Sequence, residues 1–231
     1  MEIARDLLKT KVAELKTELV AVPSSAPLTK VVGTLRKRNA YEAFIVDDAK
    51  IGMVSIRDIL RAKHVHSRKA SSLAVQIPNL TPETLVREGA SVMTDYRVRA
   101  LPIVKDGEAI GEITALSICK ALHATTALDF TVDKVMTSHP ITVHVDDPLA
   151  KAKTLMSRRN IDHLPVLQDG KTVGVVLSHR LLDSILPPER SMKHGWTPET
   201  RALNRLSVKG LMERPLTCDV GEKTSPPSSA G

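Results

Sequence analysis

Apolar and polar positions along this 231-residue chain follow one pattern in three separate places. Each copy has a short apolar run, a polar turn with aspartate, and a second short run that opens on a glycine. Short apolar runs on either side of a turn predict the two strands of a hairpin. Asp-Gly turns in the second and third copies support this, because glycine adopts a positive φ without steric cost. The three copies are AFIVDDAKIGMVS (Ala43–Ser55), LPIVKDGEAIGEIT (Leu101–Thr114) and LPVLQDGKTVGVVL (Leu164–Leu177).

Helical patterns flank each hairpin. Before the first hairpin, Leu28, Val31, Val32 and Leu35 share one face of a predicted helix, and similar apolar spacing precedes the other two. Thr81-Pro82 and Asp147-Pro148 predict helix starts, because a capping side chain followed by proline favours a helix N-terminus. After the hairpins, second helices are predicted over Ile56–Ala62, Ala115–Ala121 and Ser178–Ile185. The order predicts an α+β fold of tandem β-α-β-β-α repeats, about sixty residues each.

The repeats also predict how the chain is organised. A fourth leading segment, VKGLMERPLTCDV (Val208–Val220), resembles VDKVMTSHPITVHV (Val132–Val145), but no hairpin pattern follows it in this sequence. The last residues, SPPSSAG, are typical of disorder. The predicted divisions are repeats over 9–65, 69–125 and 130–186, a linker over 187–204, a partial fourth repeat over 205–224 and a disordered tail over 225–231.

Composition narrows the class of protein. Hydrophobic residues are 42% of the chain but aromatic residues only 2%, so the core is expected to be aliphatic. No apolar run approaches the roughly 18 residues of a membrane span, and the N-terminus lacks the apolar core of a secretion signal. The two cysteines, Cys119 and Cys218, share no metal-ligand spacing. We therefore expect a cytoplasmic protein in a reducing compartment, without a membrane partner or a metal.

The net charge of +7 makes anionic partners plausible. Most of the basic excess is interpreted as solvated surface, although nucleic acid stays possible because basic charge binds phosphate without regard to sequence. The scarcity of aromatic side chains weakens that alternative, since single-strand binders stack bases on them. The densest basic group is Arg57, Arg61, Lys63, Arg68 and Lys69.

The repeats resemble the CBS domain, the family named for cystathionine β-synthase. The resemblance is carried by VMT-x-x-P-IT-V at Val135–Val143, by the x-LPV starts of the hairpins, and by the spacing of Gly52, Ser55 and Asp58. It implies that repeats pack in pairs through their sheets, with clefts between them. It also implies a regulatory ligand, AMP, ADP, ATP or S-adenosylmethionine, and no required cofactor.

Ser55 and Asp58 are the strongest candidates for contacting that ligand. Backbone N–H groups at the start of a helix favour a phosphate, and a carboxylate can accept both hydroxyls of a ribose. The resemblance implies these roles for Ser55 and Asp58, with Gly52 in the same turn. The alternative is purely structural, because S-x-x-D is also a helix capping box, worth about 1 kcal/mol without any ligand.

The other copies depart from this pattern. The second has Thr114 and Ser117 in place of the hydroxyl and the acid, which predicts a weaker or differently tuned site. The third has Leu177 and Arg180 there, so its site is doubtful. By resemblance, a basic side chain before x-LPV would contact phosphate and an aliphatic one would lie against adenine, although helix-end charge and core packing explain them equally well. These further candidates are Val98, Arg99, Thr137, Ile161 and His163.

No catalytic constellation is recognisable, and the pair His64-x-His66 has no acidic or cysteine neighbour that would suggest a metal. We therefore predict a non-enzymatic regulatory module that binds an adenosyl ligand between repeats, forms a homodimer and acts on an unknown effector protein. Two alternatives stay open. One is a basic scaffold that binds nucleic acid with vestigial nucleotide sites. The other is a structural interaction subunit of a kinase, transporter or dehydrogenase.

Overall fold

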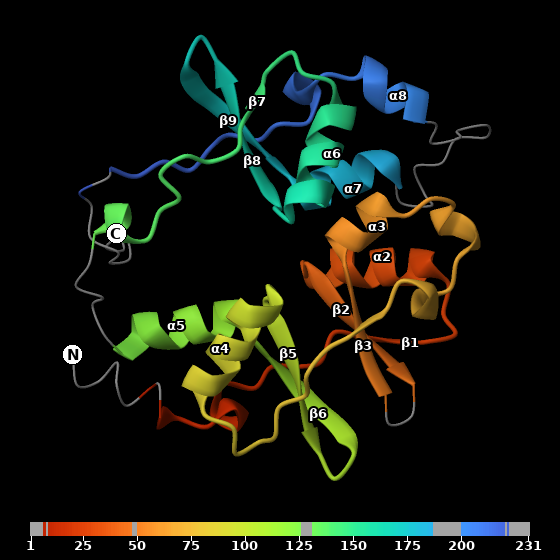
Figure 1. Ribbon diagram of the computed structural model, residues 1–231, viewed down its shortest axis with the longest axis vertical. Helices are drawn as coiled ribbons and strands as arrows, with labels where there is room; N and C mark the ends of the chain where they lie inside the picture. Colours follow the sequence, from red (N-terminus) through yellow and green to blue (C-terminus); the bar gives the residue numbers. More distant parts are fainter. Residues whose placement is uncertain are drawn as a thin grey trace. The chain divides into compact units, whose positions relative to one another are not determined.

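The structure is a computed structural model that describes residues 7, 9–47, 50–125, 131–186, 200–219 and 221. The first and third repeats have the predicted β-α-β-β-α order (Figure 1). The first contains β1 (Ala21–Pro23), α2 (Leu28–Arg38), β2 (Glu42–Asp47), β3 (Lys50–Ser55) and α3 (Ile56–Arg61). The second contains α4 (Val86–Tyr96), β5 (Ala100–Lys105), β6 (Glu108–Thr114) and α5 (Ala115–Thr125). The second repeat has only the order α-β-β-α around its own sheet, because β4 (Val75–Gln76) pairs with β3 of the first sheet and Leu80 forms only an isolated bridge to Ile103. The third contains β7 (Val143–His144), α6 (Leu149–Arg159), β8 (His163–Gln168), β9 (Lys171–Leu177) and α7 (Ser178–Ile185).

The leading segments of the repeats share a further element, a short 3₁₀ turn. It occurs in the leading segment of each of the three repeats and again in the segment that resembles a fourth. This supports the resemblance between Val208–Val220 and Val132–Val145 that the sequence indicates. The remaining elements are β4 (Val75–Gln76), η2 (Val65–Ser67) and α8 (Thr200–Arg205). The four related turns are η1 (Val12–Leu15), η3 (Ala70–Ser72), η4 (Val132–Lys134) and η6 (Val208–Gly210). The predicted tail lies outside the described residues, as does most of the predicted linker.

The hairpin turns form as the Asp-Gly pairs predict. Asp106 and Gly107 have φ values of 52° and 84°, and Asp169 and Gly170 have 50° and 74°. Two successive positive φ angles define the tight turn whose twist matches that of the flanking strands. These turns fix the register of β5 with β6 and of β8 with β9.

Two helix starts differ from the prediction. Helix α4 begins at Val86 rather than near Thr81, because Thr81 and Thr84 instead close a turn of their own, with the Thr81 N–H donating to Thr84 Oγ1 at 3.0 Å. Helix α6 begins at Leu149, one residue after the predicted proline, and the Asp147 carboxylate accepts from the His144 N–H outside the helix.

The leading segments of the first two repeats pair with strands of each other's sheets. The strand order of the first sheet is β1-β2-β3-β4, in which β1 lies parallel to β2 and β4, from the segment before the second repeat, lies antiparallel to β3. In return, Thr17 from the first repeat's leading segment bridges Glu112 on β6. The first two repeats therefore exchange segments. The third sheet, β7-β8-β9, receives Glu213 on Val175 in the same antiparallel way.

The glycine that the sequence predicts at the start of each second hairpin strand lies inside β3, β6 and β9, and the crossing segments explain it. A Cβ on Gly111 would lie 2.5 Å from Lys16 Cγ and 2.7 Å from the Thr17 carbonyl oxygen. At Gly52 and Gly174 the same atom would lie 2.9 Å from Ala74 Cβ and 2.7 Å from Met212 Sδ. The glycine therefore makes room for the crossing segment.

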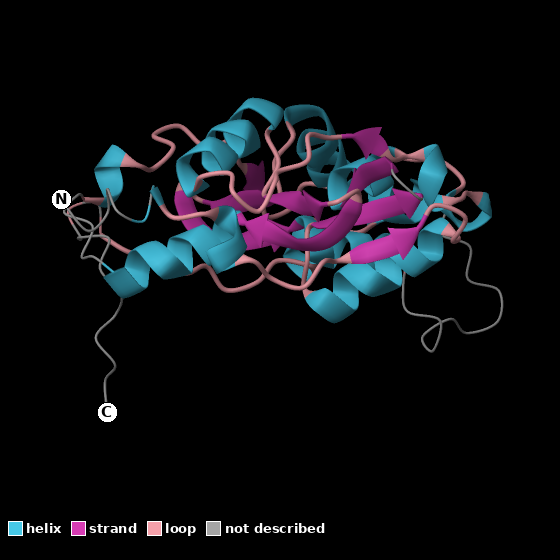
Figure 2. Ribbon diagram, turned by 90° about the horizontal axis from the view of Figure 1, so that it is seen from below, coloured by secondary structure: helices cyan, strands magenta, loops and turns pink. Residues whose placement is uncertain are grey.

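The chain divides into two compact units whose boundaries cut across the first repeat. One unit comprises Met1–Val54, His66–Met136 and Asp219–Gly231, and the other comprises Ser55–Val65 and Thr137–Cys218. The core of the first unit joins both of its repeats through Val12, Phe44, Leu101 and Ile103, all at 0% exposure. In the second unit, α3 packs against α6 and α7 of the third repeat. Helices lie against the strands of each sheet (Figure 2).

Within the part of the chain that the structure describes, no helix is both long and apolar enough to cross a membrane.

Candidate nucleotide site

The Ser55–Asp58 turn connects β3 to α3. The Ser55 side chain accepts from the Asp58 N–H at 3.2 Å, and Asp58 Oδ2 accepts from the Ser55 N–H at 3.0 Å and from Ser55 Oγ at 2.6 Å. These reciprocal bonds form the complete capping box that the sequence offered as an alternative. The cap fixes the Asp58 carboxylate at the first turn of the helix.

The cap does not fully bury Asp58. Its side chain is 24% exposed, and Oδ1 lies 3.7 Å from the Arg61 guanidinium, which is itself 51% exposed. A carboxylate oxygen that points toward solvent can still accept a hydroxyl, although a ribose there would compete with Arg61. Capping and ligand binding are therefore compatible roles for the same carboxylate.

The second repeat forms a similar cap with hydroxyls alone. The Ser117 N–H donates to Thr114 Oγ1 at 2.9 Å, and the Thr114 N–H donates to Ser117 Oγ at 3.1 Å. The turn thus has the shape of the first repeat without its negative charge. In the third repeat Leu177 provides no side-chain cap, as its sequence indicates.

Arg99 and Val98 lie where the second repeat's helix α4 gives way to β5. The Arg99 guanidinium carbon stacks 4.2 Å above the Tyr41 ring, and the Arg99 N–H donates to Glu42 Oε2 at 2.9 Å. Arg99 and Val98 are both half-buried. The cation–π contact orients the guanidinium between the first two repeats, so a phosphate at Arg99 would meet a side chain that is already held in place.

A second buried acid, Glu112, lies in the same unit. Glu112 is 6% exposed and accepts from the Val20 N–H at 3.0 Å. Burial, and then the negative charge of Glu42, raise the pKa of Glu112 to about 7, against the opposing effects of the Val20 hydrogen bond and of Arg38. Glu112 therefore gains or loses its proton near neutral pH, and this changes the charge between the first two repeats.

The remaining predicted residues belong to the third repeat and its leading segment. Ile161 is half-buried at the turn between α6 and β8, His163 is exposed at the start of β8, and Thr137 is exposed. Ile161 and His163 lie in the same unit as Ser55 and Asp58, whereas Gly52, Val98, Arg99, Thr114 and Ser117 lie in the other.

Arg57 was not predicted as a site residue, and it is an exception to the interpretation of most of the basic excess as solvated surface. Its side chain is 7% exposed and lies 3.2 Å from Asp162 Oδ2, itself 1% exposed. The Arg57 guanidinium also donates to the Asn160 carbonyl oxygen at 3.0 Å. A sequence pattern gives no signal for this pair, because its members are about a hundred residues apart and lie in polar stretches.

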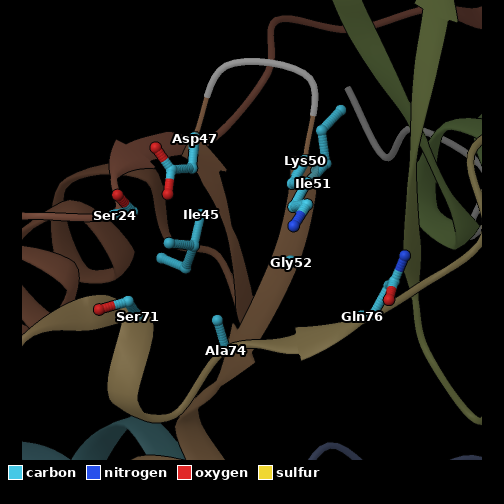
Figure 3. Close-up of a pocket in the computed structure, with 9 residues that line it drawn as sticks. All are labelled: Ser24, Ile45, Asp47, Lys50, Ile51, Gly52, Ser71, Ala74 and Gln76. Atoms are coloured by element: carbon cyan, nitrogen blue, oxygen red, sulfur yellow. The ribbon is translucent and has the colours of Figure 1, made fainter.

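A shallow pocket of about 180 Å³ lies at the turn end of the first hairpin (Figure 3). Ser24 and Asp47 lie on one side of it, and Lys50 and Gln76 on the other. Of the predicted residues only Gly52 lines it, and its volume is below the roughly 300 Å³ typical of ligand pockets. Neither Ser55 nor Asp58 lines it.

Among the described residues, no group of three or more His, Cys, Asp or Glu side chains is placed to hold a metal ion. The predicted site residues that bear functional groups include the hydroxyl and carboxylate of Ser55 and Asp58 and the guanidinium of Arg99.

Comparison with known proteins agrees with this architecture. The CBS domain family matches residues 12–65, 74–124 and 132–187, and the chain belongs to that family. The chain is 31% identical over 200 residues to the uncharacterized protein MJ1404 of Methanocaldococcus jannaschii, covering 83% of this chain and 47% of that protein. It is 35% identical over 95 residues to the L-aspartate semialdehyde sulfurtransferase of the same organism, covering 40% of this chain and 18% of that protein.

The fold is also that of a solved structure, MJ1225 from Methanocaldococcus jannaschii, which has been proposed as an archaeal homolog of g-AMPK. The TM-score is 0.82 at 20% identity, over 93% of this chain and 86% of MJ1225. This likeness establishes the tandem CBS fold. The chain spans less than half of the length of the two curated relatives named above.

Proposed function

We propose that this protein is a regulatory module, without catalytic activity of its own, that binds an adenine nucleotide or S-adenosylmethionine at the Ser55–Asp58 turn. The observation that carries the proposal is the partly exposed Asp58 carboxylate, held rigidly by Ser55 at the start of α3. Of the three equivalent turns, only this one combines a hydroxyl with an acid. The ligand class follows from membership of the CBS domain family.

Regulation would follow from where the ligand binds. Helix α3 packs against α6 and α7 of the third repeat, so a ligand at its first turn can bias the arrangement of elements from two repeats. We propose that this bias is transmitted to an effector protein. Large exposed apolar side chains, including Tyr96 at 56% and Leu116 at 64%, support the further proposal of a homodimer. Light scattering of the purified chain tests that state.

Binding is tested by thermal unfolding and calorimetric titration with AMP, ADP, ATP and S-adenosylmethionine. Ligand at about 100 times its dissociation constant adds about 2.7 kcal/mol of stability. Asp58→Ala should abolish the ligand-induced shift in midpoint. The matched control is Glu88→Ala, because Glu88 caps α4 through the Leu85 N–H at 3.1 Å and lies outside the proposed site.

The control variant should lose stability but keep the full ligand-induced shift. If Asp58→Ala and Glu88→Ala respond equally to ligand, Asp58 is only a helix cap. If no ligand shifts the wild-type midpoint, the regulatory proposal is wrong. Salt-dependent binding to generic RNA or DNA would then favour the nucleic-acid scaffold.

A further inference from the structure

A buried ion pair ties helix α3 of the first repeat to the third repeat. In Figure 1, α3 lies beside α7, and the two helices are in contact. Arg57 extends from the first turn of α3, and its guanidinium is 3.2 Å from the Asp162 carboxylate at the turn between α6 and β8. With side-chain exposures of 7% and 1%, both charges are removed from solvent.

The surroundings of this pair hold Asp162 firmly. Ser178 Oγ donates to Asp162 Oδ1 at 2.7 Å, and the Ser178 N–H donates to the Asp162 carbonyl oxygen at 2.9 Å. Ser178 is the first residue of α7 and is 0% exposed. Arg57 bonds in turn to the carbonyl oxygen of Asn160, whose left-handed backbone ends α6. One guanidinium therefore joins the start of α3, the end of α6 and, through Asp162, the start of α7.

Such a pair is a poor source of net stability. Removing two charges from water costs about as much as their attraction returns, so apolar residues of similar volume would often serve equally well. Its distinctive property is geometric: a guanidinium bonded to both a carboxylate and a carbonyl oxygen admits few alternative arrangements. This favours a role in fixing how α3 lies on the third repeat.

Arg57 and Asp162 are each flanked in the sequence by candidate ligand residues. Arg57 lies between Ser55 and Asp58, and Asp162 lies between Ile161 and His163. Because α3 is a helix of six residues, any displacement of Arg57 also displaces the Asp58 carboxylate. The ion pair thus connects the two groups of predicted site residues that share this unit.

We propose that Arg57 is a positioning residue whose ion pair with Asp162 couples ligand binding at the Ser55–Asp58 turn to the third repeat. The inference rests on the proposed function, since it needs a ligand at that turn. Arg57 would act through Asp58, its neighbour in the first turn of α3, while its own guanidinium bonds to the Asn160 carbonyl oxygen and pairs with Asp162.

The test is a double-mutant cycle in ligand affinity, measured by calorimetry on the full chain with AMP and ATP. The variants are Arg57→Met, Asp162→Asn and the double variant; asparagine keeps an acceptor for Ser178. Coupling energies between sites correspond to roughly 5- to 150-fold changes in affinity, so each single variant should weaken binding about tenfold. Because both remove the same pair, the double variant should also be about tenfold weaker, and not a hundredfold.

A second measurement reports the third repeat directly. Hydrogen exchange with and without ligand should show slower exchange over residues 160–182 of the wild type on binding, and no such change in the three variants. The matched control is Arg38→Gln, which breaks the exposed pair of Arg38 with Glu18 and should leave affinity and exchange as in the wild type.

The outcomes separate the possibilities. Weaker binding by Arg57→Met with normal binding by Asp162→Asn would make Arg57 a direct ligand contact, and the coupling proposal would be wrong. Unchanged affinity in every variant, with reduced unfolding stability, would make the pair purely structural. If the wild type binds none of the four ligands of the family, the proposed function itself is wrong. If Arg57→Met does not fold, Asp162→Asn alone decides between coupling and its absence.

Discussion

Glu112 on β6 of the second repeat accepts a hydrogen bond from the backbone N–H of Val20, which leads into β1 of the first, at 3.0 Å. The contact follows from the exchange of leading segments, because Thr17 pairs with Glu112 in an isolated antiparallel bridge just before the chain reaches Val20. A carboxylate is thereby buried between two repeats, with one backbone donor and with Glu42 raising its pKa.

Glu112 should make stability fall as pH rises toward neutrality. Its pKa is raised from 4.5 to about 7 by burial and by Glu42, so between these values the folded protein holds a proton that the unfolded chain has lost. The contribution is complete below the unfolded pKa and is lost as pH rises through the folded one. Urea unfolding between pH 4.5 and 8 should show a loss on the order of 3 kcal/mol from this group.

Glu112→Gln provides the control for that profile. Glutamine keeps an acceptor for the Val20 N–H and cannot ionise, so the variant should be more stable than the wild type at pH 8 and similar to it near pH 4.5. Any other group that titrates in this range contributes to both proteins alike, so the difference between the two profiles is the informative quantity. Parallel profiles would show that Glu112 ionises normally.

Gly111→Ala should destabilise the exchanged pair of repeats. The added Cβ would lie 2.5 Å from Lys16 Cγ and 2.7 Å from the backbone oxygen of Thr17. The φ of 157° is also a backbone conformation that L side chains rarely adopt, so alanine there is strained as well. The Lys16 side chain can move, but the Thr17 carbonyl cannot do so without shifting the crossing segment. Overpacking of this kind typically costs about 1–3 kcal/mol, measurable by chemical unfolding.

Gly33→Ala is the matched substitution. Gly33 lies inside α2 with nothing within 4 Å of the added Cβ, so alanine should stabilise the helix by up to about 1 kcal/mol. If Gly111→Ala were neutral or stabilising like Gly33→Ala, the leading segment would not lie against β6 as the structure shows.

The sequence predicted the fold to the level of strands and turns. Asp-Gly turns and short apolar runs are local signals, so the hairpins and the helices after them fall where expected. The starts of α4 and α6 were missed because Thr81-Pro82 and Asp147-Pro148 satisfy the same local preferences in a turn as in a helix cap. The segment exchange was not predicted, since nothing local specifies which sheet edge a leading segment joins.

The candidate site was less predictable from sequence. The Ser55–Asp58 turn is local and forms as a capping box. Arg57, Asp162 and Glu112 are charged residues in polar surroundings, where exposure is the ordinary expectation. Their burial arises from contacts between segments far apart in the chain, so no spacing rule could identify them.

Changing Arg57 and Asp162 together should cost less stability than the sum of the two single changes. Arg57→Met leaves the buried Asp162 carboxylate without its cation, and Asp162→Asn leaves the buried guanidinium without its anion, although Asn160 and Ser178 still bond to them. Breaking one side of a buried pair typically costs about 3–5 kcal/mol. The double variant should lose less than the sum, because no uncompensated charge is left.

Guanidinium unfolding of the four proteins measures this cycle without any ligand, so it is independent of the binding experiments. The expected interaction free energy between Arg57 and Asp162 is favourable and larger than about 1 kcal/mol. Additive losses would mean that the two side chains contribute separately, and that α3 is held on the third repeat by the apolar contacts of Ile56, Ile59 and Leu60, each no more than 2% exposed. In that case the ion pair could not transmit ligand binding either, because its members would be energetically independent.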